Sequence, residues 1–171
     1  MESFWEEVSS ATLRQGDYLL NCPVPVFQDQ PNSTGQQSFP VRGYDLVIVT
    51  QSCDLDNQKV GLAASCPMYP IVEYEKVNQA LAKKGRWEEV RKGRGEALHL
   101  LSSPINPSDN RAALVVDFRE IYSVPVEFLS KHAQAQGLRW RLKSPYLEHF
   151  SQAFARFFMR VGLPSSIPPF K

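Results

Sequence analysis

The hydrophobic positions of this chain fall mostly in short runs that predict strands. The run at 46–50, Leu-Val-Ile-Val-Thr, is continuous and largely β-branched, which is typical of a central strand buried on both faces. The run at 60–72 is interrupted by prolines and predicts a strand that returns as the hairpin partner of the first. Shorter apolar runs at 97–101 and 113–118 predict two further strands.

Three other segments complete the predicted strands and loops. The segment 18–27 is expected to be extended, and its two prolines favour a sheet edge because proline cannot donate to a strand ladder. A stretch rich in Gln, Pro, Ser and Gly at 28–43 predicts a long polar loop. At 138–142, Leu-Arg-Trp-Arg-Leu alternates apolar and basic residues, which predicts a strand with one solvent-exposed, cationic face.

Helical patterns occur at the start, the middle and the end of the chain. Ser3 and Glu6 have the spacing of a capping box, which predicts a short opening helix that contains Phe4, Trp5 and Val8. The segment 75–94 predicts two short helices or one broken helix. The segment 126–136 predicts a helix that ends at Gly137.

The last predicted helix has the clearest amphipathic pattern. Ser144 is the expected N-cap, Pro145 the first helical residue, and Gly162 with Pro164 the end. An apolar stripe is predicted to face the core, with a polar line opposite to it. The stripe consists of Tyr146, Phe150, Phe154, Phe157, Phe158 and Val161, and the polar line of Glu148, Gln152, Arg156 and Arg160.

Length and composition favour one globular domain over residues 1–171, of the α+β class. The chain has 171 residues, of which 43% are hydrophobic and 22% charged, so it can bury a core without cross-links. No apolar stretch approaches the roughly 20 residues of a membrane span, and the N-terminus is acidic where a secretory signal is basic. We therefore expect a cytoplasmic protein that does not bind membranes.

Charge is distributed unevenly between the two halves. Residues 1–70 contain three Lys/Arg and eight Asp/Glu, a net charge of −5, whereas residues 71–171 have a net charge of +6. Nucleic-acid affinity is therefore expected in the second half, although a solvated helical face is the alternative explanation for its cations. The candidate nucleic-acid-binding residues are Lys83, Lys84, Arg86, Trp87, Arg91, Lys92, Arg94, Arg139 and Arg141.

The three cysteines, Cys22, Cys53 and Cys66, are predicted to be reduced because their number is odd and they lack the spacing of a zinc site. No metal site is expected. Cys53 stands between Gln51 and Asp54 at the end of the central strand. It is either a nucleophile, part of a polar binding pocket, or a buried small side chain above a turn capped by its neighbours. Catalysis would require a nearby histidine, and the candidates are His99, His132 and His149.

The order of these elements resembles the MazF/PemK group of toxins. Gly16-Asp17 precedes the first strand, a polar loop and a hydrophobic strand follow, and the stretch 113–129 is similar to the strand and helix after the insert of those toxins. The resemblance covers about residues 15–130. It implies a small SH3-like barrel with a helical insert at 75–94, followed by a C-terminal strand and helix at 138–164.

The same resemblance implies candidate catalytic residues. Proteins of this group cleave RNA with an arginine at the start of the second strand, which Arg42 matches, and a Thr or Ser after the third. Met68-Tyr69-Pro70-Ile71 offers no such hydroxyl. The candidate catalytic set is thus Arg42 with Gln51, Cys53 and Asp54. Two motifs, at 49–55 and 144–164, also resemble segments of a bacterial family without an assigned activity.

Two functions follow as hypotheses. The first is a non-catalytic binding module that interacts with a partner protein, a second copy of itself, or RNA or DNA, in a bacterial defence or toxin–antitoxin-like system. The alternative is a metal-independent endoribonuclease of the MazF/PemK type. A cysteine-dependent enzyme is a third idea. No cofactor is expected, because Walker, Rossmann, nucleophile-elbow and zinc motifs are missing from the sequence.

Overall fold

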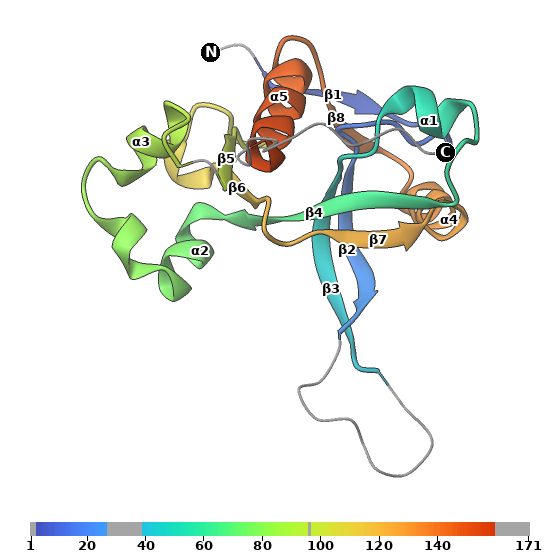
Figure 1. The fold of residues 1–171 in the computed structure, drawn as a ribbon, viewed down its shortest axis with the longest axis horizontal. Coiled ribbons are helices and arrows are strands. Elements are labelled where there is room, and N and C mark those ends of the chain that lie inside the picture. Colours follow the sequence, from blue (N-terminus) through green and yellow to red (C-terminus); the bar gives the residue numbers. More distant parts are fainter. Residues whose placement is uncertain (1–2, 27–38, 96, 160–171) are drawn as a thin grey trace, which may run out of the picture.

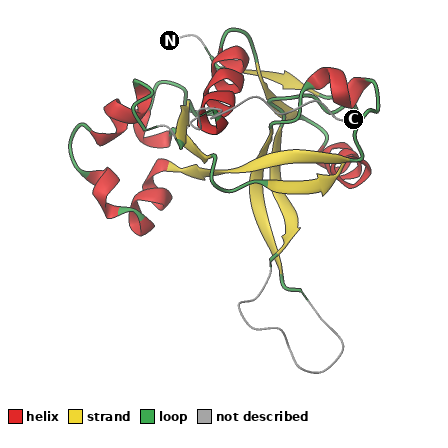
Figure 2. Cartoon of the chain, viewed as in Figure 1, coloured by secondary structure: helices red, strands yellow, loops and turns green. Residues whose placement is uncertain are grey.

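The computed structural model describes residues 3–26, 39–95 and 97–159, and shows helices packed around antiparallel strands (Figures 1 and 2). The predicted α+β class is confirmed. The strands are β1 Trp5–Val8, β2 Tyr18–Pro25, β3 Val41–Ile48, β4 Leu62–Pro70, β5 Leu98–Leu101, β6 Leu114–Asp117, β7 Tyr122–Pro125 and β8 Arg139–Leu142. The helices are α1 Ser52–Asp56, α2 Ile71–Val77, α3 Arg86–Arg91, α4 Val126–Gln136 and α5 Tyr146–Phe158, with 3-10 turns η1 Gln79–Ala82 and η2 Asn110–Ala112.

The long strand β4 organises the larger sheet. Six strands take part in this sheet, in the order β2-β3-β4-β6-β5, and β7 also pairs with β4. The first half of β4 pairs with β7 and its last residues pair with β6, so one strand supports two neighbours in succession. Strands β1 and β8 form a separate pair, which an isolated bridge between Asp17 and Arg141 links to the larger sheet. The pairings of the described residues do not close this sheet into a barrel.

Strand β3 separates two hydrophobic cores. Successive side chains of a strand point to opposite faces, so Leu46 and Ile48 lie in one core and Val47 and Val49 in the other. The first core contains α4 and the second contains α5. The prediction of a strand buried on both faces is therefore confirmed.

Several other predictions are confirmed by the described residues. The segment 60–72 returns as β4 and pairs antiparallel with β3, and the short helix α1 lies between the two strands. The edge position of the proline-containing segment is also confirmed, because β2 ends the strand order. Helix α4 has the predicted bounds and is followed by Gly137, whose φ of 75° favours glycine.

The structure corrects the predicted opening helix. Residues 5–8 form β1, and Ser3 bonds the backbone of Trp5 without capping a helix. Trp5 is buried in the α5 core and its indole donates to the Ser102 carbonyl at 2.7 Å. Pairing with β8 therefore decided the conformation of this segment against its local pattern.

The C-terminal helix is confirmed in its described part, with changes at both ends. Pro145 occupies the N-cap position and Ser144 makes no capping bond. Phe150 is fully buried and Phe154 and Phe157 pack against the same core, whereas Phe158 is 55% exposed. The predicted end at Gly162 and Pro164, Val161, Arg160 and most of the predicted polar loop lie outside the described residues. None of the described helices is long and apolar enough to cross a membrane.

Candidate functional site

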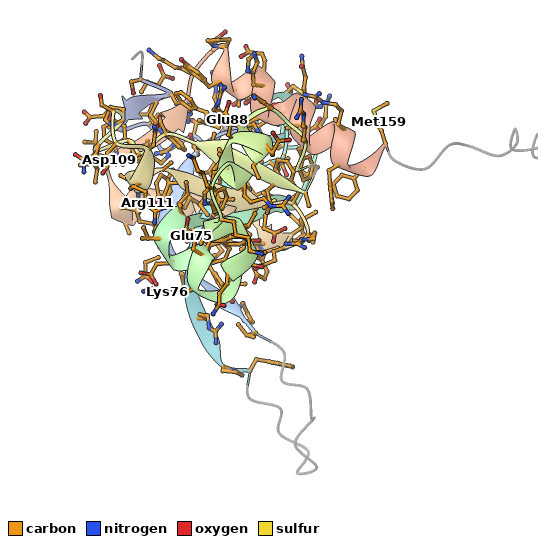
Figure 3. The ribbon with its side chains drawn as sticks, turned by 90° about the vertical axis from the view of Figure 1, so that its left-hand side faces the viewer. Glu75, Lys76, Glu88, Asp109, Arg111 and Met159 are labelled. Atoms are coloured by element: carbon orange, nitrogen blue, oxygen red, sulfur yellow. The ribbon has the colours of Figure 1, made fainter. Side chains whose placement is uncertain are left out.

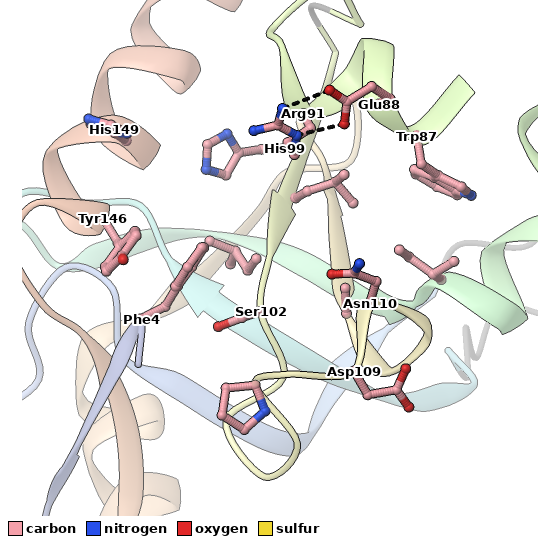
Figure 4. A pocket seen from close by; sticks show the side chains of 15 residues that line it. Phe4, Trp87, Glu88, Arg91, His99, Ser102, Asp109, Asn110, Tyr146 and His149 are labelled. Carbon is pink, nitrogen blue, oxygen red and sulfur yellow. Dashed lines mark hydrogen bonds and ion pairs between the residues drawn. The ribbon is translucent and has the colours of Figure 1, made fainter. Parts of the chain in front are cut away.

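A groove lies between α3, β5 and α5, on the side of the molecule that carries the helical insert (Figure 4). It consists of a cavity of about 620 Å³ and an adjoining hollow of about 420 Å³. The two share Arg91, His99, Leu100 and His149 as lining residues, so they are direct neighbours, and we call them together the α3–α5 groove. A cavity of this size matches the pockets that hold small ligands.

The two ends of the groove differ in chemistry. The larger cavity, its aromatic half, is walled by Phe4, Trp87 and Tyr146 together with aliphatic side chains, and the carboxylates of Glu88 and Asp109 also line it. Phe4 and Tyr146 stack with ring centroids 3.7 Å apart, and this contact holds the residue before β1 against the start of α5. The smaller hollow, its cationic half, is lined by Arg91, Lys92, His99, His149, Gln152 and Arg156.

Helical periodicity places the α5 residues in the groove. His149, Gln152 and Arg156 are three and four residues apart, so they lie on one face of the helix, while Phe150 and Phe154 point to the core. His99 comes from β5 on the opposite wall, where its ring packs on Phe118 and Phe150 with centroids 6.0 and 5.6 Å apart. Core packing of α5 and β5 therefore determines the width of the groove.

Three ion pairs of the insert take up part of its positive charge. Arg91 binds both carboxylate oxygens of Glu88 at 2.7 Å, and Lys92 lies 3.5 Å from the same group. The Arg91 guanidinium holds the pKa of Glu88 at about 2. Arg94 pairs with Glu89. These contacts are exposed, where ion pairs contribute little to stability, so Arg91 and Lys92 remain available to an anion at low cost.

Trp87 is fixed by a second set of charged contacts. Its indole donates to Glu75 at 2.7 Å, and Arg111 binds both oxygens of the same carboxylate at 2.9 and 2.7 Å. Hydrogen bonds from Arg111 and then Trp87 lower the pKa of Glu75 to about 2. Glu75 of the insert and Arg111 of η2 lie close together on the surface, with Glu88 on the same side (Figure 3). These hydrogen bonds among Glu75, Trp87 and Arg111 connect α2, α3 and η2 and hold the Trp87 ring at the cavity wall.

His99 is a strongly perturbed titratable group of the groove. Burial, followed by the neighbouring charges of His149 and Arg156, lowers its pKa from 6.5 to about 4. The ring is therefore neutral at pH 7, whereas a histidine in the unfolded chain begins to bind protons below about pH 6.5. Between about pH 4 and pH 6.5, the unfolded state therefore binds more protons than the folded state.

We expect this difference to make stability fall as the pH falls from about 6.5 to about 4. The shift corresponds to at most about 3 kcal/mol of unfolding free energy, present above pH 6.5 and lost by pH 4. Urea denaturation of wild type and His99→Gln at several pH values isolates this contribution, because carboxylates titrate in both proteins. A difference between the two proteins that stays constant from pH 7 to pH 4 would contradict the assignment.

The predicted catalytic residues do not assemble into one site. Arg42 lies at the start of β3 and Cys53 beyond its end, in α1 (Figure 1). The six residue steps from Arg42 to Ile48, at about 3.3 Å each, alone separate the two ends by roughly 20 Å. One scissile phosphate cannot contact both residues, so the structure does not support the combination of Arg42 with Gln51, Cys53 and Asp54.

Cys53 is exposed, so the interpretation as a buried small side chain is wrong. Its Sγ lies 3.6 Å from Gln51 Oε1 and 3.8 Å from Asp54 Oδ1. The candidate histidine partners have other neighbours: His132 Nε2 lies 2.8 Å from the Leu20 carbonyl oxygen, and His99 and His149 line the groove. Cys53 therefore has a polar setting without a histidine base among its described contacts.

All three cysteines are free thiols, as predicted. Cys22 and Cys66 are buried in the two cores, and burial raises the pKa of Cys22 to about 11 and that of Cys66 to about 12. Both are therefore protonated at neutral pH and serve as core residues.

The predicted exposed cationic face of β8 is wrong. The Arg139 side chain is fully buried and its guanidinium binds Asp17, with further bonds to the Ser10 and Thr12 carbonyls. Arg141 binds the same carboxylate. Alternation does place both arginines on one strand face, but that face meets the buried Asp17. Arg139 is therefore buried, and Arg141 forms an ion pair with the same carboxylate.

The remaining predicted cations lie on the surface of the insert. Lys83, Lys84 and Arg86 are exposed, and the ion pairs found within the described residues do not include them. Sequence reasoning missed that His149 and Arg156 join Arg91 and Lys92 in one groove. Their spacing of seven residues on an amphipathic helix was visible, but which wall they would face depends on tertiary packing.

Neither a protein-family model, a curated protein nor a solved structure matches this chain.

Proposed function

We propose that this chain is a non-catalytic binding module that holds single-stranded RNA or DNA in the α3–α5 groove. The observation that carries the proposal is that an aromatic-walled cavity adjoins a hollow lined by Arg91, Lys92 and Arg156. Proteins that bind single strands combine these two features, because cations follow the phosphates and aromatic rings stack on bases. A duplex would keep its bases out of the cavity, so a single strand fits better.

The surface around the groove supports this ligand class. Lys83 and Lys84 before α3 and Arg86 at its start are exposed on the insert and add positive charge at the end of the helix where Trp87 lines the cavity. We place the domain with the MazF/PemK-like SH3-like barrels, in a defence or toxin–antitoxin-like setting, on the resemblance alone. The separation of Arg42 from Cys53 favours binding over cleavage.

The double variant Lys92→Glu/Arg156→Glu tests the proposal. Wild type should bind a fluorescent 12-nucleotide strand at low salt, with an affinity that falls as salt rises by about 0.7 log units per log unit for each neutralised phosphate. The variant should bind at least tenfold more weakly and show a shallower salt dependence. Fluorescence anisotropy across a salt series measures both quantities.

The matched control is Lys76→Glu/Lys131→Glu. It changes net charge by the same amount, and both lysines are exposed partners of a carboxylate on helices α2 and α4. This control should retain most of the affinity. Equal losses in the two variants would reduce the effect to overall charge, and absence of binding by wild type at low salt would overturn the proposal in favour of a protein partner.

Integrity of the bound strand separates binding from cleavage. An RNA labelled at one end should remain intact after incubation with wild type in the absence of divalent cations. RNA fragments that form with wild type but not with the Arg42→Ala variant would instead establish a ribonuclease and refute the non-catalytic assignment.

A further inference from the structure

We propose that the α3–α5 groove is built for one nucleoside monophosphate, with the base in the aromatic half and the phosphate in the cationic half. The ligand is either the terminal nucleotide of a strand or a free nucleotide, because both present the same chemistry. The strand version rests on the proposed function, whereas the free nucleotide does not.

Ser102 points to a ligand with a polar edge in the aromatic half. Its Oγ is buried and has no hydrogen-bond partner among the described residues, and the side chain lines the cavity near Phe4 (Figure 4). Buried polar groups are nearly always hydrogen-bonded in proteins. The Ser102 carbonyl is already bonded by the Trp5 indole, which holds this residue in place. A base supplies the missing partner, since its edge carries both donors and acceptors.

The opposite wall of the cavity adds an amide. Asn110 of η2 lines the same cavity, and its side chain is drawn toward the open space in Figure 4. A hydroxyl and an amide around an aromatic-walled cavity are the groups that fix the orientation of a planar heterocycle. An aliphatic or purely apolar ligand would leave the buried Ser102 hydroxyl without a partner.

The cationic half fits a phosphate. Arg91, Lys92 and Arg156 line it together with two histidines, and no carboxylate is among its described lining residues. Glu88, which lines the adjoining cavity, pairs with Arg91 and Lys92, so Arg156 is the cation of this half that the described ion pairs do not include. Arg156 donates its Nε to the Gln152 carbonyl at 3.4 Å, which leaves its other guanidinium nitrogens for a phosphate. The shared residues Arg91, His99 and His149 join this half to the aromatic cavity.

Calorimetric titration distinguishes the two halves. We expect each of AMP, GMP, CMP and UMP to bind wild type at least tenfold more tightly than the matching nucleoside or inorganic phosphate. Arg156→Gln should weaken the nucleotides at least tenfold and leave the nucleosides unchanged. Ser102→Ala should weaken nucleotides and nucleosides by the same factor. Lys131→Gln, on the surface of α4, is the control and should bind like wild type.

The outcomes separate this inference from the proposed function. If nucleotides bind, and a 5′-phosphorylated strand displaces a bound nucleotide better than a 5′-hydroxyl strand does, capture of a strand end is supported. Nucleotides that bind while strands do not would support the free nucleotide and refute strand binding. Strands that bind while nucleotides neither bind nor compete would overturn this inference alone. Nucleotide affinity that survives Arg156→Gln would also overturn it.

Discussion

Phe150→Ala is expected to lower the free energy of unfolding by about 3–5 kcal/mol, because it removes a fully buried aromatic ring from the α5 core. Phe150 packs against Phe118 and His99, with ring centroids 5.7 and 5.6 Å apart. A loss of this size is a large part of the stability of an ordinary domain. Chemical denaturation followed by circular dichroism measures it, and Phe150→Leu, which leaves a smaller cavity, should cost less.

Phe158→Ala is the matched control on the same helix. Its ring is 55% exposed, so truncation should cost less than about 1 kcal/mol. If the two truncations cost the same, the assignment of the buried face of α5 is wrong. Loss of Phe150 should also loosen His99, because the two rings are in contact across the groove wall.

Asp17→Asn is expected to destabilise the fold by a similar amount, about 3–5 kcal/mol, since it leaves buried positive charge without its partner. Asp17 is fully buried and accepts hydrogen bonds from Arg139, Arg141 and the Arg14 backbone. The pairs join the start of β2 to β8. Gly16 precedes them with φ of 84°, and a side chain there would lie 2.9 Å from Leu142 Cβ.

Glu127→Gln provides the comparison for this prediction. Glu127 pairs with Lys131, but the two side chains are 82% and 72% exposed, so the change should leave stability close to that of wild type. Denaturant midpoints of both variants measure the contrast. Similar midpoints would show that the Asp17 contacts do not hold β8 in place.

The sequence predicted the central elements well. The β-branched run at 46–50 identified most of the buried part of β3, and the prolines of β2 identified a sheet edge. Helix α4 has the predicted bounds because its 3.6-residue pattern ends at a glycine that adopts positive φ. In each case the local preference of the residues agrees with their tertiary environment.

Predictions failed where distant residues decided the outcome. Residues 5–8 have a helical capping pattern, yet pairing with β8 makes them a strand. The sequence pattern predicts Arg139 at the surface, yet its side chain is buried in an ion pair with Asp17, which is distant in the sequence. Arg42 and Cys53 are close in sequence, but an extended strand holds them apart.

The sequence by itself determined the α+β class, the double-faced central strand, the amphipathic α5 and the excess of positive charge in the second half. These features follow from periodicity, turn residues and composition, which are local properties of the chain. Only the tertiary structure decided which cations meet. Arg139 and Arg141 are tied to a core carboxylate, whereas Arg91, Lys92, His149 and Arg156 line one groove. The physical reason is that a cation's role depends on the groups packed around it, and long-range packing of α5 against β5 brings those groups together.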